Sequence, residues 1–110
     1  MAYDEALAAR IRDRIGARPD LTEKTMFGGL AFLVGGNLAV AASGQGGILV
    51  RVDPAESDAL VSATPAEPME MRGRGMPGWL RLASDDVASD PALAGWVERG
   101  IAYARSLPAK

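Results

Sequence analysis

The side chains in this sequence that could do chemistry are carboxylates, arginines and two lysines, because histidine and cysteine are absent from its 110 residues. Ser-His-Asp and Cys-His catalysis therefore cannot occur, and neither imidazole nor thiolate is available as a metal ligand. Lys110 is the last residue, so a lysine nucleophile would have to be Lys24. Carboxylate chemistry and a hard-metal carboxylate site remain open.

The acidic residues are not grouped as a catalytic pair or a metal site would be. Asp53 and Glu56 flank a predicted helix start, where capping of free amides explains them. Asp85, Asp86 and Asp90 precede the last predicted helix and have the same explanation. We therefore predict no catalytic residue, no metal and no cofactor, and we do not expect an enzyme.

Residues 73–78 have the G-x-G-x-x-G spacing with which dinucleotide-binding proteins admit a pyrophosphate beside a helix N-terminus. A strand-like segment, residues 79–82, follows here in place of a helix, and Pro77 disturbs the turn. This context speaks against a dinucleotide site. Arg72 and Arg74 leave a milder alternative, in which a loop contacts an anionic ligand.

Apolar and glycine residues also permit a small-ligand pocket, because thioethers and aromatic rings make adaptable pocket walls. The pocket would lie under the turn at residues 26–29 and the loop at residues 76–79, with an arginine holding an anion. Its candidate residues are Met26, Phe27, Gly28, Gly29, Arg51, Arg72, Arg74, Met76, Gly78 and Trp79. The simpler alternative places the large apolar side chains of this set in the core.

A basic cluster in the first predicted helix raises the alternative of nucleic-acid binding. Helical spacing puts Arg10, Arg14 and Arg18 on one side, where they could face phosphates. The formal net charge of the whole chain is -2, so no global positive field supports such binding. A solvated helix face is the simpler interpretation.

The composition is that of one globular domain spanning residues 1–110, with 48% hydrophobic and 24% charged residues. Charges every few residues at the N-terminus exclude a signal peptide there, and no apolar run is long enough to span a membrane. We expect a cytoplasmic protein that does not bind membranes.

The order of predicted elements is helix, strands, helix, strands, helix. Tyr3, Leu7, Ile11 and Ile15 recur every four positions and indicate an amphipathic N-terminal helix. The predicted strands are residues 24–27, 30–34, 37–42 and 48–52, joined as an antiparallel meander, and later residues 69–71 and 79–82. Helices are predicted from Asp53 to about residue 61 and from Ser89 to Pro108, with Trp96 in the core. This pattern predicts a two-layer α+β sandwich.

Three segments carry a family resemblance. They are the run from Met26 to Val40 (MFGGLAFLVGGNLAV), Met76-Pro77-Gly78-Trp79, and the closing helix with Trp96-Val97-Glu98-Arg99-Gly100. Together they resemble the N-terminal domain of the TfoX/Sxy family over nearly the whole chain. The resemblance implies an α+β domain similar to secretion-chaperone-like folds, a link to regulation of competence for DNA uptake, and no established catalytic residues. The regulators carry a second, C-terminal domain, and we expect a stand-alone N-terminal domain here.

The function expected from these observations is that of a non-enzymatic regulatory or protein-interaction module. A homodimer is one expected assembly, because a small sandwich of this kind leaves a sheet face or edge to cover. A protein partner is the other.

Overall fold

The computed structural model describes residues 3–16, 18–26, 28–71 and 73–109, with the backbone alone at residues 71 and 74. Three α-helices, six strands and two short 3-10 helices follow one another in this part of the chain. They are α1 (Glu5–Ile15), β1 (Leu21–Met26), β2 (Gly29–Val34), β3 (Asn37–Ala42), β4 (Ile48–Arg51), η1 (Pro54–Glu56), α2 (Ser57–Ala63), β5 (Glu67–Met71), β6 (Arg74–Leu82), η2 (Ser84–Val87) and α3 (Asp90–Ser106).

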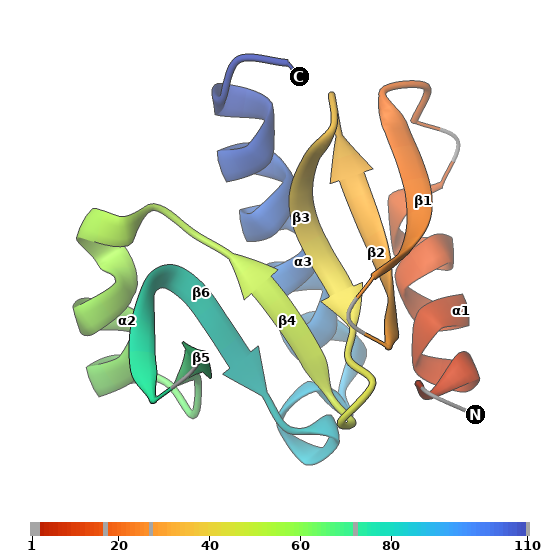
Figure 1. The fold of residues 1–110 in the computed structure, drawn as a ribbon. Coiled ribbons are helices and arrows are strands. Elements are labelled where there is room, and N and C mark those ends of the chain that lie inside the picture. The colour runs from red at the N-terminus through yellow and green to blue at the C-terminus, as the bar shows by residue number, and fades with distance from the viewer. Residues whose placement is uncertain (1–2, 17, 27, 72, 110) are drawn as a thin grey trace.

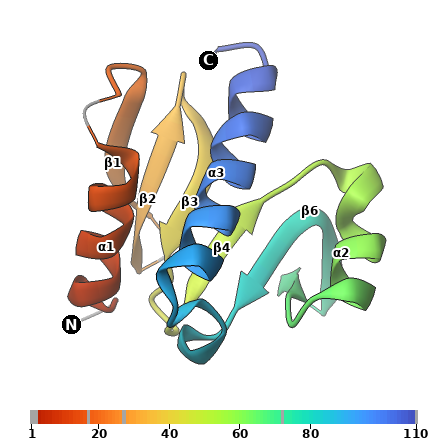
Figure 2. The ribbon, with the colours of Figure 1, turned by 180° about the vertical axis from the view of Figure 1, so that it is seen from behind.

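All six strands form one antiparallel sheet in the order β1-β2-β3-β4-β6-β5. The predicted α+β class and the meander of the first four strands are confirmed. Helices α1 and α3 lie against one face of this sheet, and α2 lies beside β5 and β6 (Figures 1 and 2). Among the described helices, none combines the length and apolar character needed to cross a bilayer.

The core lies between the helices and this face of the sheet. Leu7, Ile11 and Ile15 of α1 are buried there, as the four-residue spacing predicts. From α3, Val97 and Ile101 pack against the same core, and Trp96 is partly buried beside it. No described helix covers the opposite face of the sheet, where a second, smaller apolar cluster is buried by side chains of the strands themselves.

Turns and caps follow local sequence signals. Gly35 and Gly36 have φ values of 57° and 86° and join the paired residues Val34 and Asn37, which is a reversal that only glycine makes without strain. The Asp53 carboxylate accepts a hydrogen bond from the Ala55 amide at 2.9 Å. These local features explain why β3 and the second helical segment begin where the sequence predicts.

The structure corrects several boundaries. The first strand begins at Leu21 rather than at residue 24, because Leu21 pairs with Val34 across the hairpin. The last strand begins at Arg74, so most of the G-x-G-x-x-G segment lies in β6, and no helix follows it directly. Helix α2 is preceded by a 3-10 turn, and Glu56 accepts from Arg99 at 3.2 Å.

Candidate functional site

The face of the sheet opposite the helices is apolar. We call it the open face, and its floor consists of Ala31, Leu38, Ala41 and Leu49, which neighbouring side chains bury. Four partly buried side chains surround that floor, and they are Met26, Leu33, Met69 and Trp79. No described helix covers this floor, and the surrounding side chains leave each of its four residues at most 8% exposed, so the floor is a second, smaller apolar cluster on this side of the sheet.

Strand register explains how these residues come together. Lys24 pairs with Ala31, Ala31 with Ala41, Ala41 with Leu49, and Leu49 with Arg81. Because directly paired residues of an antiparallel sheet point to the same side, this row crosses five strands on the open face. Two alanines and a leucine lie between Lys24 and Arg81 in these five strands, and on the sixth strand, β5, Glu67 pairs with Arg81.

Curvature of the sheet brings its two outer strands to one cavity. Met26 from β1 and Met69 from β5 both line a cavity of about 70 Å³, whose floor includes Ala31, Ala41 and Leu49. Cavities that enclose small-molecule ligands are usually about 300–1,000 Å³. The hollow therefore suits one or two apolar side-chain groups rather than a whole small molecule.

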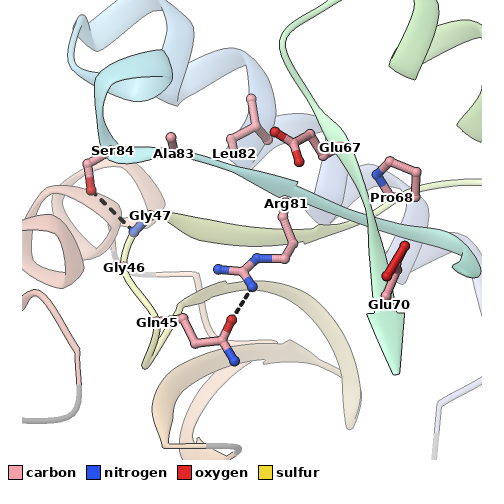
Figure 3. Close-up of a pocket in the computed structure, with 10 residues that line it drawn as sticks. All are labelled: Gln45, Gly46, Gly47, Glu67, Pro68, Glu70, Arg81, Leu82, Ala83 and Ser84. Atoms are coloured by element: carbon pink, nitrogen blue, oxygen red, sulfur yellow. Dashed lines mark hydrogen bonds between the residues drawn. The ribbon is translucent and has the colours of Figure 1, made fainter. Parts of the chain in front are cut away.

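A larger, more polar groove of about 590 Å³ adjoins this cavity (Figure 3). The two hollows share Arg81 and Gln45, and Arg81 donates a hydrogen bond to the Gln45 amide oxygen between them. The Glu67 side chain points toward Leu82 and away from the Arg81 guanidinium (Figure 3). The groove therefore presents its charged groups separately and does not assemble them into a catalytic constellation.

Arg51 occupies the end of β4 next to Trp79 of β6, its partner in the register. The Arg51 guanidinium carbon lies 4.9 Å from the centroid of the Trp79 ring and 5.8 Å from that of Tyr103 on α3. Cation–π contacts of this kind hold a guanidinium in a defined orientation. The two rings thus position a third cation at the margin of the open face.

The predicted ligand-binding residues are only partly brought together. Met26 and Gly29 line the small cavity, whereas none of residues 76–79 does. Gly78 has a structural role, because its amide donates to the Ser57 hydroxyl at 2.6 Å and its φ is 85°. Gly28 forms a turn with φ 74°, Met76 is half-buried, and Arg51 stacks on Trp79. Phe27 and Arg72 lie outside the described residues, as does the Arg74 side chain.

The arginines predicted as a phosphate-facing stripe are engaged with acids. Arg10 contacts Asp90 at 3.1 Å, while Arg14 and Arg18 share the Glu98 carboxylate at 3.0 and 2.7 Å. Each positive charge is thus compensated within the fold. Nucleic-acid binding by this helix stays a prediction, and the ion pairs weigh against it.

Two carboxylates have perturbed acidities, and both belong to these helix-side ion pairs. Hydrogen bonds from Arg18 lower the pKa of Glu98, with a smaller contribution from Arg14. A bidentate hydrogen bond from Arg12, at 2.7 and 2.9 Å, lowers the pKa of Glu23. In both cases the pKa is lowered because the arginines stabilise the charged carboxylate, as in other structural ion pairs. A lowered carboxylate pKa does not suit proton transfer near neutral pH.

Among the residues that the structure describes, no three Asp or Glu side chains lie close enough together to bind a metal ion. The open face itself is lined by apolar side chains, with Lys24, Arg51 and Arg81 around them.

Sequence reasoning missed several residues of this face. From the sequence, Lys24 is a candidate only as a nucleophile, and Arg81 and Gln45 are not candidate site residues. The alternation Leu80-Arg81-Leu82 does signal that Arg81 points away from the core. The neighbours of Arg81 on the adjacent strands depend on the order of the strands in the sheet. No local sequence pattern predicts that order.

Comparison with known proteins gives a family and no individual relative. Residues 13–104 match the sequence model of the TfoX N-terminal domain. The match includes all six strands and therefore the whole open face. No curated protein and no solved structure matches the chain significantly, so the expected likeness to secretion-chaperone folds stays a prediction.

Proposed function

The chain belongs to the TfoX N-terminal domain family, and we propose that it is a non-enzymatic protein-interaction module that binds a partner on the open face of its sheet. The observation that carries this proposal is the apolar floor of Ala31, Leu38, Ala41 and Leu49, which is separate from the core beneath the helices. Figures 1 and 2 show that α1 and α3 lie on the other face of the sheet. Small residues in the floor let an incoming chain approach the sheet closely, and Met26 and Met69 provide adaptable walls.

Charge indicates the kind of partner. Lys24 and Arg81 stand at the two ends of the central row and Arg51 stands at the margin, so three cations surround the apolar floor, with Glu67 of β5 as the acidic neighbour of Arg81. Electrostatic complementarity favours an oppositely charged partner. The occupant we propose is a protein segment in which apolar side chains, for the floor, alternate with Asp or Glu.

A second copy of the chain fits this face less well. A two-fold contact would bring the same patch of both copies together, so two surfaces that each carry Lys24, Arg51 and Arg81 would meet, and like charges across an interface are destabilising. The exposed edge strand β1 has the same difficulty. If β1 paired with β1 of a second copy about a two-fold axis at the middle of the strand, either Glu23 would lie opposite Glu23 of the copy or Lys24 opposite Lys24 of the copy. Like charges directly opposite one another weaken strand pairing.

The test is a titration of the isotope-labelled protein followed by amide chemical shifts. The probe is a synthetic ten-residue peptide of alternating leucine and glutamate, and the comparison peptide has lysine in place of each glutamate. We expect shifts at Ala31, Ala41, Leu49 and Arg81 with the acidic peptide and weaker shifts with the basic one. Equal responses to both peptides, or shifts confined to the helices, would refute the proposal.

Matched variants assign the binding to the open face. Ala41→Glu places a charge in its floor and should abolish the shifts, whereas Ala102→Glu, at an exposed position of α3, should leave them unchanged. Lys24→Glu is a second variant at an exposed position, so its loss of binding cannot be attributed to misfolding. Sedimentation of the free protein completes the test, because a dimer that Ala41→Glu dissolves would make a second copy the occupant.

A further inference from the structure

Arg51 differs from the other arginines whose side chains the structure describes. Each of the others donates a hydrogen bond to an acidic side chain, to an amide oxygen or to a backbone carbonyl. Arg51 contacts the rings of Trp79 and Tyr103, and no carboxylate of a described residue lies within 4 Å of it. Its side chain is nevertheless half-buried.

The two aromatic contacts leave the N–H groups of this guanidinium available, because no described carboxylate lies within 4 Å of it. The N–H groups of the planar guanidinium donate in its own plane, toward a ligand that approaches its edge. A carboxylate is the ligand that matches this edge, because its two oxygens accept two parallel N–H bonds. Holding the side chain between β6 and α3 also removes part of the entropy that arginine loses on binding.

We propose that Arg51, oriented by Trp79 and Tyr103, is the carboxylate-binding residue of the open face. This inference rests on the function proposed above and deepens it, because it assigns one acidic side chain of the partner segment to one residue of this chain. Trp79 also packs against the floor of the open face, so the same ring joins the apolar surface to the carboxylate site.

Trp79 serves as the reporter for the test. In a Trp96→Phe background its fluorescence is the only tryptophan signal, and the probe is the leucine–glutamate peptide, compared with a leucine–glutamine peptide of equal length. We expect the glutamate peptide to bind at least tenfold more tightly. Arg51→Gln should remove that preference, and Arg51→Lys, which keeps the charge but loses the planar edge, should restore only part of it.

Arg99→Gln is the matched control, because Arg99 also lies over a tryptophan ring, that of Trp96, at 5.8 Å, but on α3. Arg99→Gln, made in the chain that retains Trp96, should leave the affinity for the leucine–glutamate peptide unchanged. In that chain the NMR signal of the Arg51 side-chain N–H groups is a second readout of binding. That signal should shift with the glutamate peptide and not with the glutamine peptide.

The outcomes separate the two proposals. If Arg51→Gln keeps the preference for glutamate while Ala41→Glu abolishes peptide binding, the open face stands and the carboxylate site is refuted. If neither peptide binds the unmodified chain, the proposed function fails as well. If inorganic phosphate or single-stranded DNA displaces the peptide from Arg51 at lower concentration than free acetate does, the assignment to a protein carboxylate is overturned.

Discussion

Gly100 on α3 lies directly against the backbone of Ala39 on β3. A Cβ atom at position 100 would be 2.3 Å from the Ala39 carbonyl oxygen, which is well inside the contact distance of two such atoms. The register of β2 and β3 shifts beside this contact, between Phe32 and Leu33. The helix therefore approaches the sheet as closely as it does because residue 100 has no side chain.

Gly100→Ala should consequently lower the free energy of unfolding by about 1–3 kcal/mol, because α3 must move away from the sheet to admit a methyl group. Gly95→Ala, in the same helix, meets nothing within 4 Å and should raise it by about 0.5–1 kcal/mol through helix propensity. Urea unfolding of both variants measures the contrast. Equal effects of the two substitutions would contradict the close contact.

Ser57→Ala should destabilise the fold, because the Ser57 hydroxyl accepts the buried amide of Gly78 at 2.6 Å. Losing this acceptor leaves a buried N–H group without a partner and should cost about 1–3 kcal/mol. Ser62→Ala, at an exposed position of α2, should change stability by less than about 0.5 kcal/mol. Thermal unfolding distinguishes the two, and a Ser57→Ala melting temperature equal to that of Ser62→Ala would argue against this role.

Glu98 should make stability depend on pH. Its pKa in the folded chain lies below the ordinary value of 4.5 because Arg18, and then Arg14, stabilise the carboxylate. As the pH falls, Glu98 therefore binds a proton in the unfolded chain before it does so in the folded chain. The stabilisation of the fold by charged Glu98 is complete above pH 4.5 and is lost as the pH falls through the pKa of Glu98 in the folded chain. Since the Glu98 side chain is 36% exposed, solvent screening limits the effect to less than about 1 kcal/mol.

Glu98→Gln removes this contribution. Between about pH 6 and pH 3 the variant should lose less stability than the unmodified chain. Asp13→Asn, at an exposed position on α1, is the control and should follow the unmodified chain more closely. Parallel stability curves for Glu98→Gln and the unmodified chain would show that the ion pairs with Arg14 and Arg18 do not contribute.

Sequence patterns predicted the parts of the fold that local chemistry determines. The cap at Asp53, the start of the last helix at Ser89 and the turn between the strands 30–34 and 37–42 are short-range features, and each was found where predicted. The start of β1 was missed because the exposed polar residues Thr22 and Glu23 hide the strand pattern before residue 24. The start of β6 was missed because its glycines and proline are typical of loops.

The candidate site was harder to predict because it depends on long-range pairing. Strand β3 is buried throughout, so alternation does not separate Ala41, on the open face, from Val40, in the core beneath the helices. The ion pair of Arg18 with Glu98 joins residues 80 positions apart. Arg51 was named as an anion-binding candidate, but its contact with Trp79 follows from the pairing of β4 with β6.

The most direct test of the central claim is a charge-swap experiment on the open face. Lys24→Glu combined with Arg81→Glu reverses the charge at both ends of the central row without changing its apolar floor. We predict that this variant prefers the leucine–lysine peptide, whereas the unmodified chain prefers the leucine–glutamate peptide, as measured by calorimetric titration of both proteins with both peptides. An unchanged preference for the acidic peptide in the double variant would contradict recognition of an acidic, apolar partner on this face.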